Sequence, residues 1–210
     1  MESYIEALEW RYATKKFDSD KKISTEALNT LKKAVQLSAS SYGLQPYEVL
    51  IIDSKDLREK LQPAAWGQSQ VFDASHLFIF CNKTAVEDLY VDNYVDQLST
   101  ERNIPSENLK GYGDFMKSKI NGLSQEEQQN WTARQAYIAL GNLLSAAAHL
   151  KIDACPMEGF EPDKFNEILG LDKKGLNAVV MAAVGYRSEE DATQHYKKVR
   201  KSENHLFTKL

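Results

Sequence analysis

The residues best suited to chemistry are basic side chains near the two ends of the chain. In WRYATKKF, Arg11 and Lys15 stand four positions apart and would share one face if the first helix continued that far. In KKVRK, Lys198 and Arg200 would point the same way in an extended segment. Two cations on one face could hold a phosphate. The ordinary interpretations are solvated charges at a helix end and a solvent-exposed charge run, respectively.

Two further segments combine small and polar residues. SASSYGLQP, residues 38–46, offers hydroxyls and backbone amides suited to a phosphate or a polar heterocycle, although such a string is ordinarily a loop that ends a helix. CPMEGF, residues 155–160, places an acid in a tight apolar turn after an alanine-rich helix. Neither segment identifies a function by itself.

Common catalytic motifs are absent from the sequence. It has no P-loop, and GYGDFM lacks the third glycine of a dinucleotide fingerprint. The histidines have no metal-binding spacing, and no nucleophile elbow is present, so we expect neither a metal site nor standard hydrolase chemistry. Cys81 and Cys155 lack ligand or redox spacing, and we expect reduced core residues.

Length and charge narrow the class of protein. A chain of 210 residues, 42% hydrophobic, can bury one sizeable core, and we expect a single domain over residues 1–210. A net charge of −4 argues against general affinity for nucleic acid or an anionic membrane surface. The N-terminal sequence is acidic where a signal peptide is basic, and no apolar run approaches a membrane span. We expect a cytoplasmic protein with no nucleic-acid or membrane partner.

The elements that would position these residues indicate an α+β fold. Strands are predicted at 47–53, 76–82 and 177–186, and the unbroken apolar character of the last indicates a sheet covered on both faces. Helices are predicted from Ser3, from Ser24 and over about 84–100, followed by a looser segment around GYGDFM. A long helix follows the capping box Ser124 to Glu127, and its alanine-rich sequence is typical of a central or subunit-interface helix.

Five segments in one order resemble the FMN-dependent nitroreductases over about residues 7–200. They are RYATKKF, SASSYGLQPY, GQSQVFDASH, DACPMEGF and KKVR. The resemblance implies a central mixed sheet flanked by helices, an intertwined homodimer, and one FMN in each of two clefts at the subunit interface. It also implies a lid-like helical region near residues 85–123 over the flavin.

The resemblance assigns the basic residues to the cofactor. Arg11, Lys198 and Arg200 match residues that bind the FMN phosphate. Lys15 matches a lysine near the pyrimidine edge of the flavin, where a positive charge would stabilise the anionic reduced ring. Ala13 stands where many members carry a serine that bonds the phosphate, so one donor is lost and the two arginines must do more.

Other correspondences extend around the flavin ring. They comprise a segment lent by the partner subunit (Ser40, Ser41 and Gly43, the last replacing a common asparagine), positions near the pyrimidine or ribityl side (Gln68, Gln70), and a turn against the isoalloxazine (Pro156, Glu158, Gly159). In that turn the backbone N–H of Glu158 would point to flavin N5, so this residue would act through its backbone. Tyr112, Phe115 and Met116 are candidates for stacking on substrate, or for ordinary core positions.

The implied activity is an NAD(P)H-dependent FMN oxidoreductase. NADH or NADPH would reduce the flavin by hydride transfer and depart, and a nitroaromatic, quinone or similar planar acceptor would then occupy the same face, in a ping-pong sequence that needs no side-chain nucleophile. Two alternatives with the same fold remain open: a flavin-binding storage or sensor protein, and a flavin-destroying or dehalogenating relative.

Overall fold

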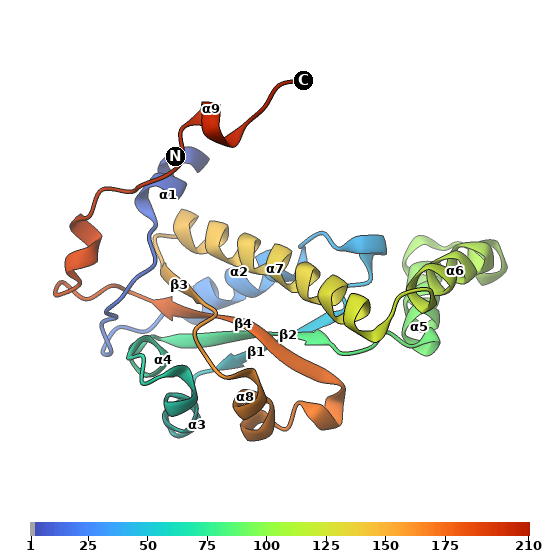
Figure 1. Cartoon of the computed structure of the whole chain (residues 1–210), viewed down its shortest axis with the longest axis horizontal. Helices are drawn as coiled ribbons and strands as arrows, with labels where there is room; N and C mark the ends of the chain where they lie inside the picture. The colour runs from blue at the N-terminus through green and yellow to red at the C-terminus, as the bar shows by residue number, and fades with distance from the viewer. Residues whose placement is uncertain (1–2) are drawn as a thin grey trace.

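A four-stranded sheet forms the centre of the molecule, for which a computed structural model describes residues 3–210 (Figure 1). The strands are β1 (Tyr47–Ile52), β2 (His76–Lys83), β3 (Asp153–Met157) and β4 (Leu176–Gly185), in the spatial order β1-β2-β4-β3. Each neighbouring pair is antiparallel. β1 and β3 are therefore edge strands, and β3 begins the segment that resembles the flavin-binding turn.

Helices cover both faces of the sheet (Figure 1). Alternate residues of β2 show this arrangement: Leu77 and Ile79 pack into the core beneath α3 (Lys55–Leu61), α4 (Gln70–Asp73) and α8 (Pro162–Leu169). Phe78 and Phe80 pack into the opposite core, beneath α2 (Thr25–Gln36) and α7 (Gln125–His149). All four side chains are fully buried, which explains why the strand is apolar without alternation.

The long helix α7 is central, as its sequence predicts. Ser124 and Glu127 form the expected capping box at its start. Alanines and leucines along α7 pack against β2, β3 and β4, and the short α1 (Tyr4–Trp10) lies against it as well. Small side chains let α7 approach the sheet closely. Because α7 contacts both α1 and β3, it links the N-terminal helix to this edge strand.

Helices α5 (Asp88–Arg102) and α6 (Ser106–Asn121) form a pair beyond one end of the sheet (Figure 1). The prediction of a looser segment around GYGDFM is therefore wrong, because these residues lie inside α6. Gly113 is buried against α5, where an added Cβ would lie 3.3 Å from Val95. Helix-helix packing thus offsets the unfavourable helix propensity of glycine, about 1 kcal/mol relative to alanine.

The sheet differs from expectation in two respects. The resemblance implied a mixed sheet, whereas the four strands pair antiparallel, and a parallel contact occurs as the isolated bridge between Ala13 and Ala154. Strand β3 was not predicted, and Cys155, expected in a turn, lies within it. Its proline suggests a turn from sequence, but an edge strand tolerates a residue without an N–H. The predicted α+β class is confirmed.

The remaining elements are short. They are the helical turns η1 (Ser41–Gly43), η2 (Pro63–Ala65), η3 (Asp172–Lys174) and η4 (Ala192–His195), and α9 (Glu203–Leu206) near the C-terminus. Among residues 3–210, no helix has both the length and the hydropathy needed to cross a membrane. Met1 and Glu2, which the expected domain includes, lie outside the described residues.

Candidate functional site

A cavity of about 590 Å³ brings together basic residues from both ends of the chain. Its walls are the segment after α1, the edge strand β3 and the segment around η4. Six of the residues that the resemblance assigns to the cofactor line it: Arg11, Ala13, Lys15, Pro156, Lys198 and Arg200. Residues separated by almost 190 positions in sequence therefore share one site.

Arg11, Ala13 and Lys15 reach the cavity from an extended segment. Arg11 and Lys15 do not share a helical face, because the first helix does not continue that far: α1 ends at Trp10, and Arg11 has extended φ and ψ of −71° and 146°. Ala13 then pairs with Ala154 of β3. Alternate residues of an extended chain face the same way, so residues 11, 13 and 15 all face the basic cavity.

The cavity has an unbalanced positive charge. Within residues 3–210 the basic side chains that line it form no ion pair with a carboxylate, and Glu9 is the acidic residue in its wall. The Nε of Arg11 is buried and has no hydrogen-bond partner in the part of the chain that the structure describes. Burial, and then the nearby charge of Arg200, lower the pKa of Arg11. A buried donor and two like charges are arrangements that a bound anion would relieve.

Lys198, which lines the cavity, also makes hydrogen bonds within the chain. Its Nζ donates hydrogen bonds to the carbonyl oxygens of Leu8 and Arg11, each at 2.5 Å. Because these carbonyls belong to the last turn of α1 and its cap, the ammonium completes the C-terminal end of that helix. An ammonium has three N–H donors, so Lys198 retains one for a ligand in the cavity.

Asp191 fastens the two basic segments together. Its carboxylate, 1% exposed, accepts hydrogen bonds from the backbone N–H groups of Lys15 (2.8 Å) and Lys16 (3.2 Å), from the hydroxyl of Tyr12 (3.0 Å), and from Thr193. Burial by itself would raise the pKa of Asp191, but these hydrogen bonds lower it from 3.8 to about 2. The segment after α1 is thereby held against η4.

We predict that Asp191 makes stability depend on pH in the acid range. Because its folded-state pKa lies below the unfolded value, its contribution is present above about pH 4 and is lost as the pH falls toward 2. The shift corresponds to roughly 2 kcal/mol. Urea unfolding should therefore show a smaller difference between wild type and Asp191→Asn at pH 3 than at pH 7. An equal difference at both pH values would contradict this assignment.

A largely buried ion pair lies behind the same segment. Asp153, the first residue of β3, accepts hydrogen bonds from the backbone N–H (2.8 Å) and Nε (2.9 Å) of Arg187, and its Oδ1 lies 2.6 Å from Nη2. The Arg187 guanidinium is 4.4 Å from the ring centre of Trp10 and 4.6 Å from that of Tyr12. The sequence patterns did not indicate this ion pair, although Arg187, a charge directly after the apolar run 177–186, was an available signal.

The turn after β3 presents an unpaired backbone donor. Within residues 3–210 the N–H of Glu158 has no hydrogen-bond partner, whereas its carbonyl accepts from the N–H of Phe160. The exposed carboxylate of Glu158 accepts a hydrogen bond from the hydroxyl of Tyr137 on α7, at 2.5 Å. An unpaired N–H at this position agrees with the backbone role expected for Glu158.

Gln68 and Gln70 do not line the basic cavity. The Nε2 of Gln68 donates to the carbonyl oxygens of Ala65 (3.0 Å) and Gly159 (2.6 Å), which uses both of its hydrogens. Gln68 could therefore approach a ligand with its Oε1 alone. Gln70 is 7% exposed and lies beside the thiol of Cys155. Burial of that thiol raises the pKa of Cys155, as expected for a core cysteine.

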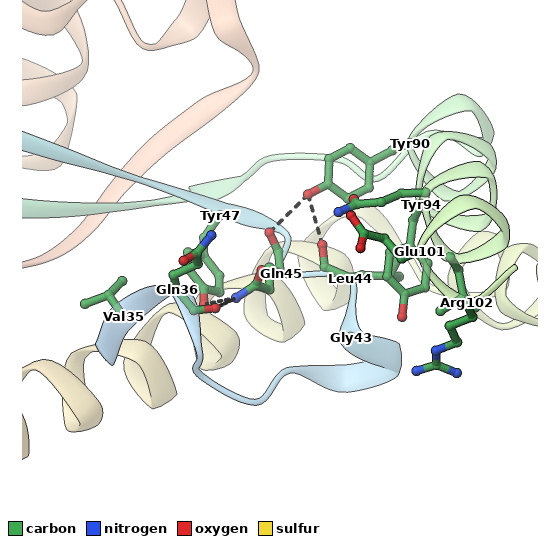
Figure 2. A pocket seen from close by; sticks show the side chains of 12 residues that line it. Val35, Gln36, Gly43, Leu44, Gln45, Tyr47, Tyr90, Tyr94, Glu101 and Arg102 are labelled. Carbon is green, nitrogen blue, oxygen red and sulfur yellow. Dashed lines mark hydrogen bonds between the residues drawn. The ribbon is translucent and has the colours of Figure 1, made fainter. Parts of the chain in front are cut away.

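The loop that carries Ser40, Ser41 and Gly43 lies apart from the basic cavity. The N–H of Ser41 donates to Gln135 of α7 at 2.8 Å. Gly43 lines another cavity, of about 540 Å³, beside α5 (Figure 2). Its φ is +80°, which L side chains rarely adopt, and a Cβ there would lie 2.5 Å from the hydroxyl of Tyr94, so a larger residue would be strained and would displace that side chain. Within a single chain, this loop therefore lies away from the basic residues that line the cavity.

The three expected substrate residues differ in accessibility. Tyr112 is 38% exposed and Phe115 50% exposed on α6, and the Phe115 ring meets Tyr42 edge-on at 6.4 Å. Met116 is fully buried in the core between α5 and α6. A substrate contact for Met116 is therefore excluded in this conformation, because its side chain serves helix packing.

Comparison with known proteins agrees with this geometry. The Nitroreductase family model matches residues 8–186, and the chain belongs to that family. A Staphylococcus epidermidis protein named "Putative NAD(P)H nitroreductase" is 39% identical over 99% of this chain and 96% of its own. The oxygen-insensitive NAD(P)H nitroreductase of Salmonella typhimurium is 31% identical, covering 86% of this chain and 87% of its own.

A solved structure shows the same fold. It is described as a putative nitroreductase in complex with FMN from Exiguobacterium sibiricum, and it has a TM-score of 0.84 with 20% identity, covering 100% of this chain and 98% of that one. The nitroreductase-type fold implied by the resemblance is therefore confirmed.

Proposed function

We propose that the protein is an FMN-dependent NAD(P)H oxidoreductase of nitroreductase type. The observation that carries the proposal is the cavity of unpaired cations, in which a buried Arg11 donor lacks a partner and stands near Arg200. The names of the relatives, and FMN in a structure of the same fold, support this choice of cofactor and reductant.

The residues present fit a flavin mononucleotide. Arg11 and Arg200 would bind the phosphate through charge-assisted hydrogen bonds, with the remaining N–H of Lys198 as a third donor. Lys15, in the same wall, would lie toward the pyrimidine edge, and the N–H of Glu158 would be the donor for the ring. When bound, FMN supplies the hydride-transfer chemistry, so the chain needs to bind, orient and shield the ring.

The acceptor would be a small planar, electron-poor molecule such as a nitroaromatic or a quinone. The exposed rings of Tyr112 and Phe115 offer stacking surfaces on α6. The α5–α6 pair, within the region near residues 85–123, would form the lid over the flavin. A single open cleft that serves both reductant and acceptor favours ping-pong kinetics, since one must leave before the other binds.

We also propose a homodimer in which each chain completes the site of the other. The loop with Ser41 and Gly43 lies away from the cations of its own chain, and the tail exposes Val199, Leu206 and Phe207 (82, 61 and 69%). In Figure 1 this tail extends away from the body of the molecule. Sedimentation of a flavin-loaded monomer at micromolar concentration would contradict the dimer.

One spectroscopic experiment tests the proposed function. The purified protein should be yellow, lose its flavin absorbance with NADH or NADPH in the absence of oxygen, and recover it when a nitroaromatic or quinone is added. Mass analysis of the heat-released cofactor should show FMN. A stable reduced state that no acceptor reoxidises would indicate a storage or sensor protein, loss of the flavin on turnover would indicate a flavin-destroying relative, and FAD would contradict the phosphate assignment.

A further inference from the structure

The turn formed by Glu158 and Gly159 is held by side chains from both faces of the sheet. Tyr137 donates its hydroxyl hydrogen to Oε1 of Glu158 at 2.5 Å, from α7 on one face. Gln68 donates from Nε2 to the carbonyl oxygen of Gly159 at 2.6 Å, from the loop between η2 and α4 on the other. The two hydrogen bonds hold adjacent residues that directly follow the edge strand β3.

Close packing leaves the turn little freedom on the Gln68 side. A Cβ on Gly159 would lie 3.0 Å from the Trp66 ring and 3.1 Å from Nε2 of Gln68. The N–H of Glu161 donates to the carbonyl of Ala64 at 2.8 Å, which attaches the next residues to η2. On the opposite side, the carboxylate of Glu158 accepts one hydrogen bond within residues 3–210, and its donor is the hydroxyl of Tyr137.

Both holding groups keep their donor character across the ordinary pH range. Burial first, and then the neighbouring carboxylate of Glu158, raise the pKa of Tyr137 to about 12, so its hydroxyl stays protonated. The amide of Gln68 faces two carbonyl oxygens, an arrangement that only its NH₂ group can satisfy.

We propose that Tyr137 and Gln68 are positioning residues that fix the turn so that the backbone N–H of Glu158 stays unpaired and available to a ligand. The consequence for a flavin rests on the proposed function. A fixed N–H donor at the reactive ring nitrogen stabilises the oxidised ring, in which that nitrogen accepts a hydrogen bond, over the reduced ring, in which it carries a proton. By fixing this N–H, Tyr137 and Gln68 would lower the reduction potential of the bound cofactor.

Hydrogen exchange in the full-length protein, with and without added FMN, tests the clamp itself. The amides of Phe160 and Glu161 report on the turn because both are hydrogen-bonded there. Tyr137→Phe keeps the ring and removes the hydroxyl, and it should speed their exchange about tenfold. Glu158→Gln keeps an acceptor oxygen and should stay near wild type. Combining Glu158→Ala with Tyr137→Phe should add little to either change alone.

A matched control comes from the other side of the molecule. The hydroxyl of Tyr90 donates to the carbonyl oxygens of Leu44 (3.1 Å) and Gln45 (3.0 Å), as Figure 2 shows. Tyr90→Phe should speed exchange in that loop and leave the amides of Phe160 and Glu161 unchanged. Gln68→Leu tests the second holding group and should release the same two amides.

Potentiometry tests the consequence for the cofactor. Tyr137→Phe should raise the midpoint potential of bound FMN, by about 30 mV if the ratio of oxidised to reduced flavin changes tenfold. Unchanged exchange in Tyr137→Phe would overturn the clamp, and faster exchange with an unchanged potential would overturn the positioning role. If the wild-type protein binds no flavin, the proposed function fails, while the exchange measurements still decide whether the clamp exists.

Discussion

Arg11→Ala is expected to weaken FMN binding about tenfold to more than a hundredfold, with the result toward the upper end. The substitution removes a charge-assisted hydrogen bond of roughly 1.5–3 kcal/mol. Ala13, in the same wall, has no hydroxyl to replace it, and Arg200 is exposed and bonded to its own segment. The affinity is measured by titrating FMN into flavin-free protein, and excess FMN should restore activity.

The same substitution should not destabilise the flavin-free protein. Among residues 3–210 Arg11 makes one long side-chain bond, 3.4 Å to the carbonyl of Tyr12, and its Nε has no partner there, while Arg200 repels it. Lys16→Ala is the matched control, because Lys16 lies outside the cavity and pairs with Glu190 at 3.3 Å on the surface. Equal FMN affinity in Arg11→Ala and wild type would remove the phosphate assignment.

The second large effect is expected at Asp153. Asp153→Ala leaves the Arg187 guanidinium without its counter-ion between Trp10 and Tyr12. Removing one partner of a buried ion pair typically costs about 3–5 kcal/mol, because the other charge stays desolvated. Urea unfolding monitored by circular dichroism should show this loss in the free energy of unfolding.

A second substitution separates the unpaired charge from the loss of packing. Adding Arg187→Met to Asp153→Ala should recover part of the stability, since no uncompensated charge then remains. Asp18→Ala is the control, because Asp18 pairs with Lys21 at the surface and should change stability little. A double variant no more stable than Asp153→Ala would mean that the carboxylate matters for its backbone contact to Arg187 rather than for charge.

Local patterns in the sequence were sufficient to predict several of the regular elements. The unbroken apolar run that became β4 predicted a buried strand, and the capping box at Ser124 predicted the start of α7, because periodicity and capping depend on neighbouring residues. Five short segments, in the same order as in the nitroreductases, also predicted the family. These are properties of short stretches, and the structure and the comparisons confirmed them.

Elements stabilised by distant contacts could not be predicted in this way. β3 contains a proline and looked like a turn, but pairing with β4 makes it a strand. α6 contains two glycines and looked irregular, but packing against α5 makes it a helix. In both cases the stabilising partner lies elsewhere in the chain, and tertiary packing outweighs local propensity.

The site shows the same division. The sequence by itself determined which residue types are present to bind an anion, and Arg11 and Arg200 could be named from it. The tertiary structure decided that Lys198 closes the end of α1, that Asp191 fastens the two basic segments, and that Tyr137 holds the turn at Glu158. Each of these hydrogen bonds joins residues at least 21 positions apart, so its geometry exists only once the sheet and α7 bring the partners together.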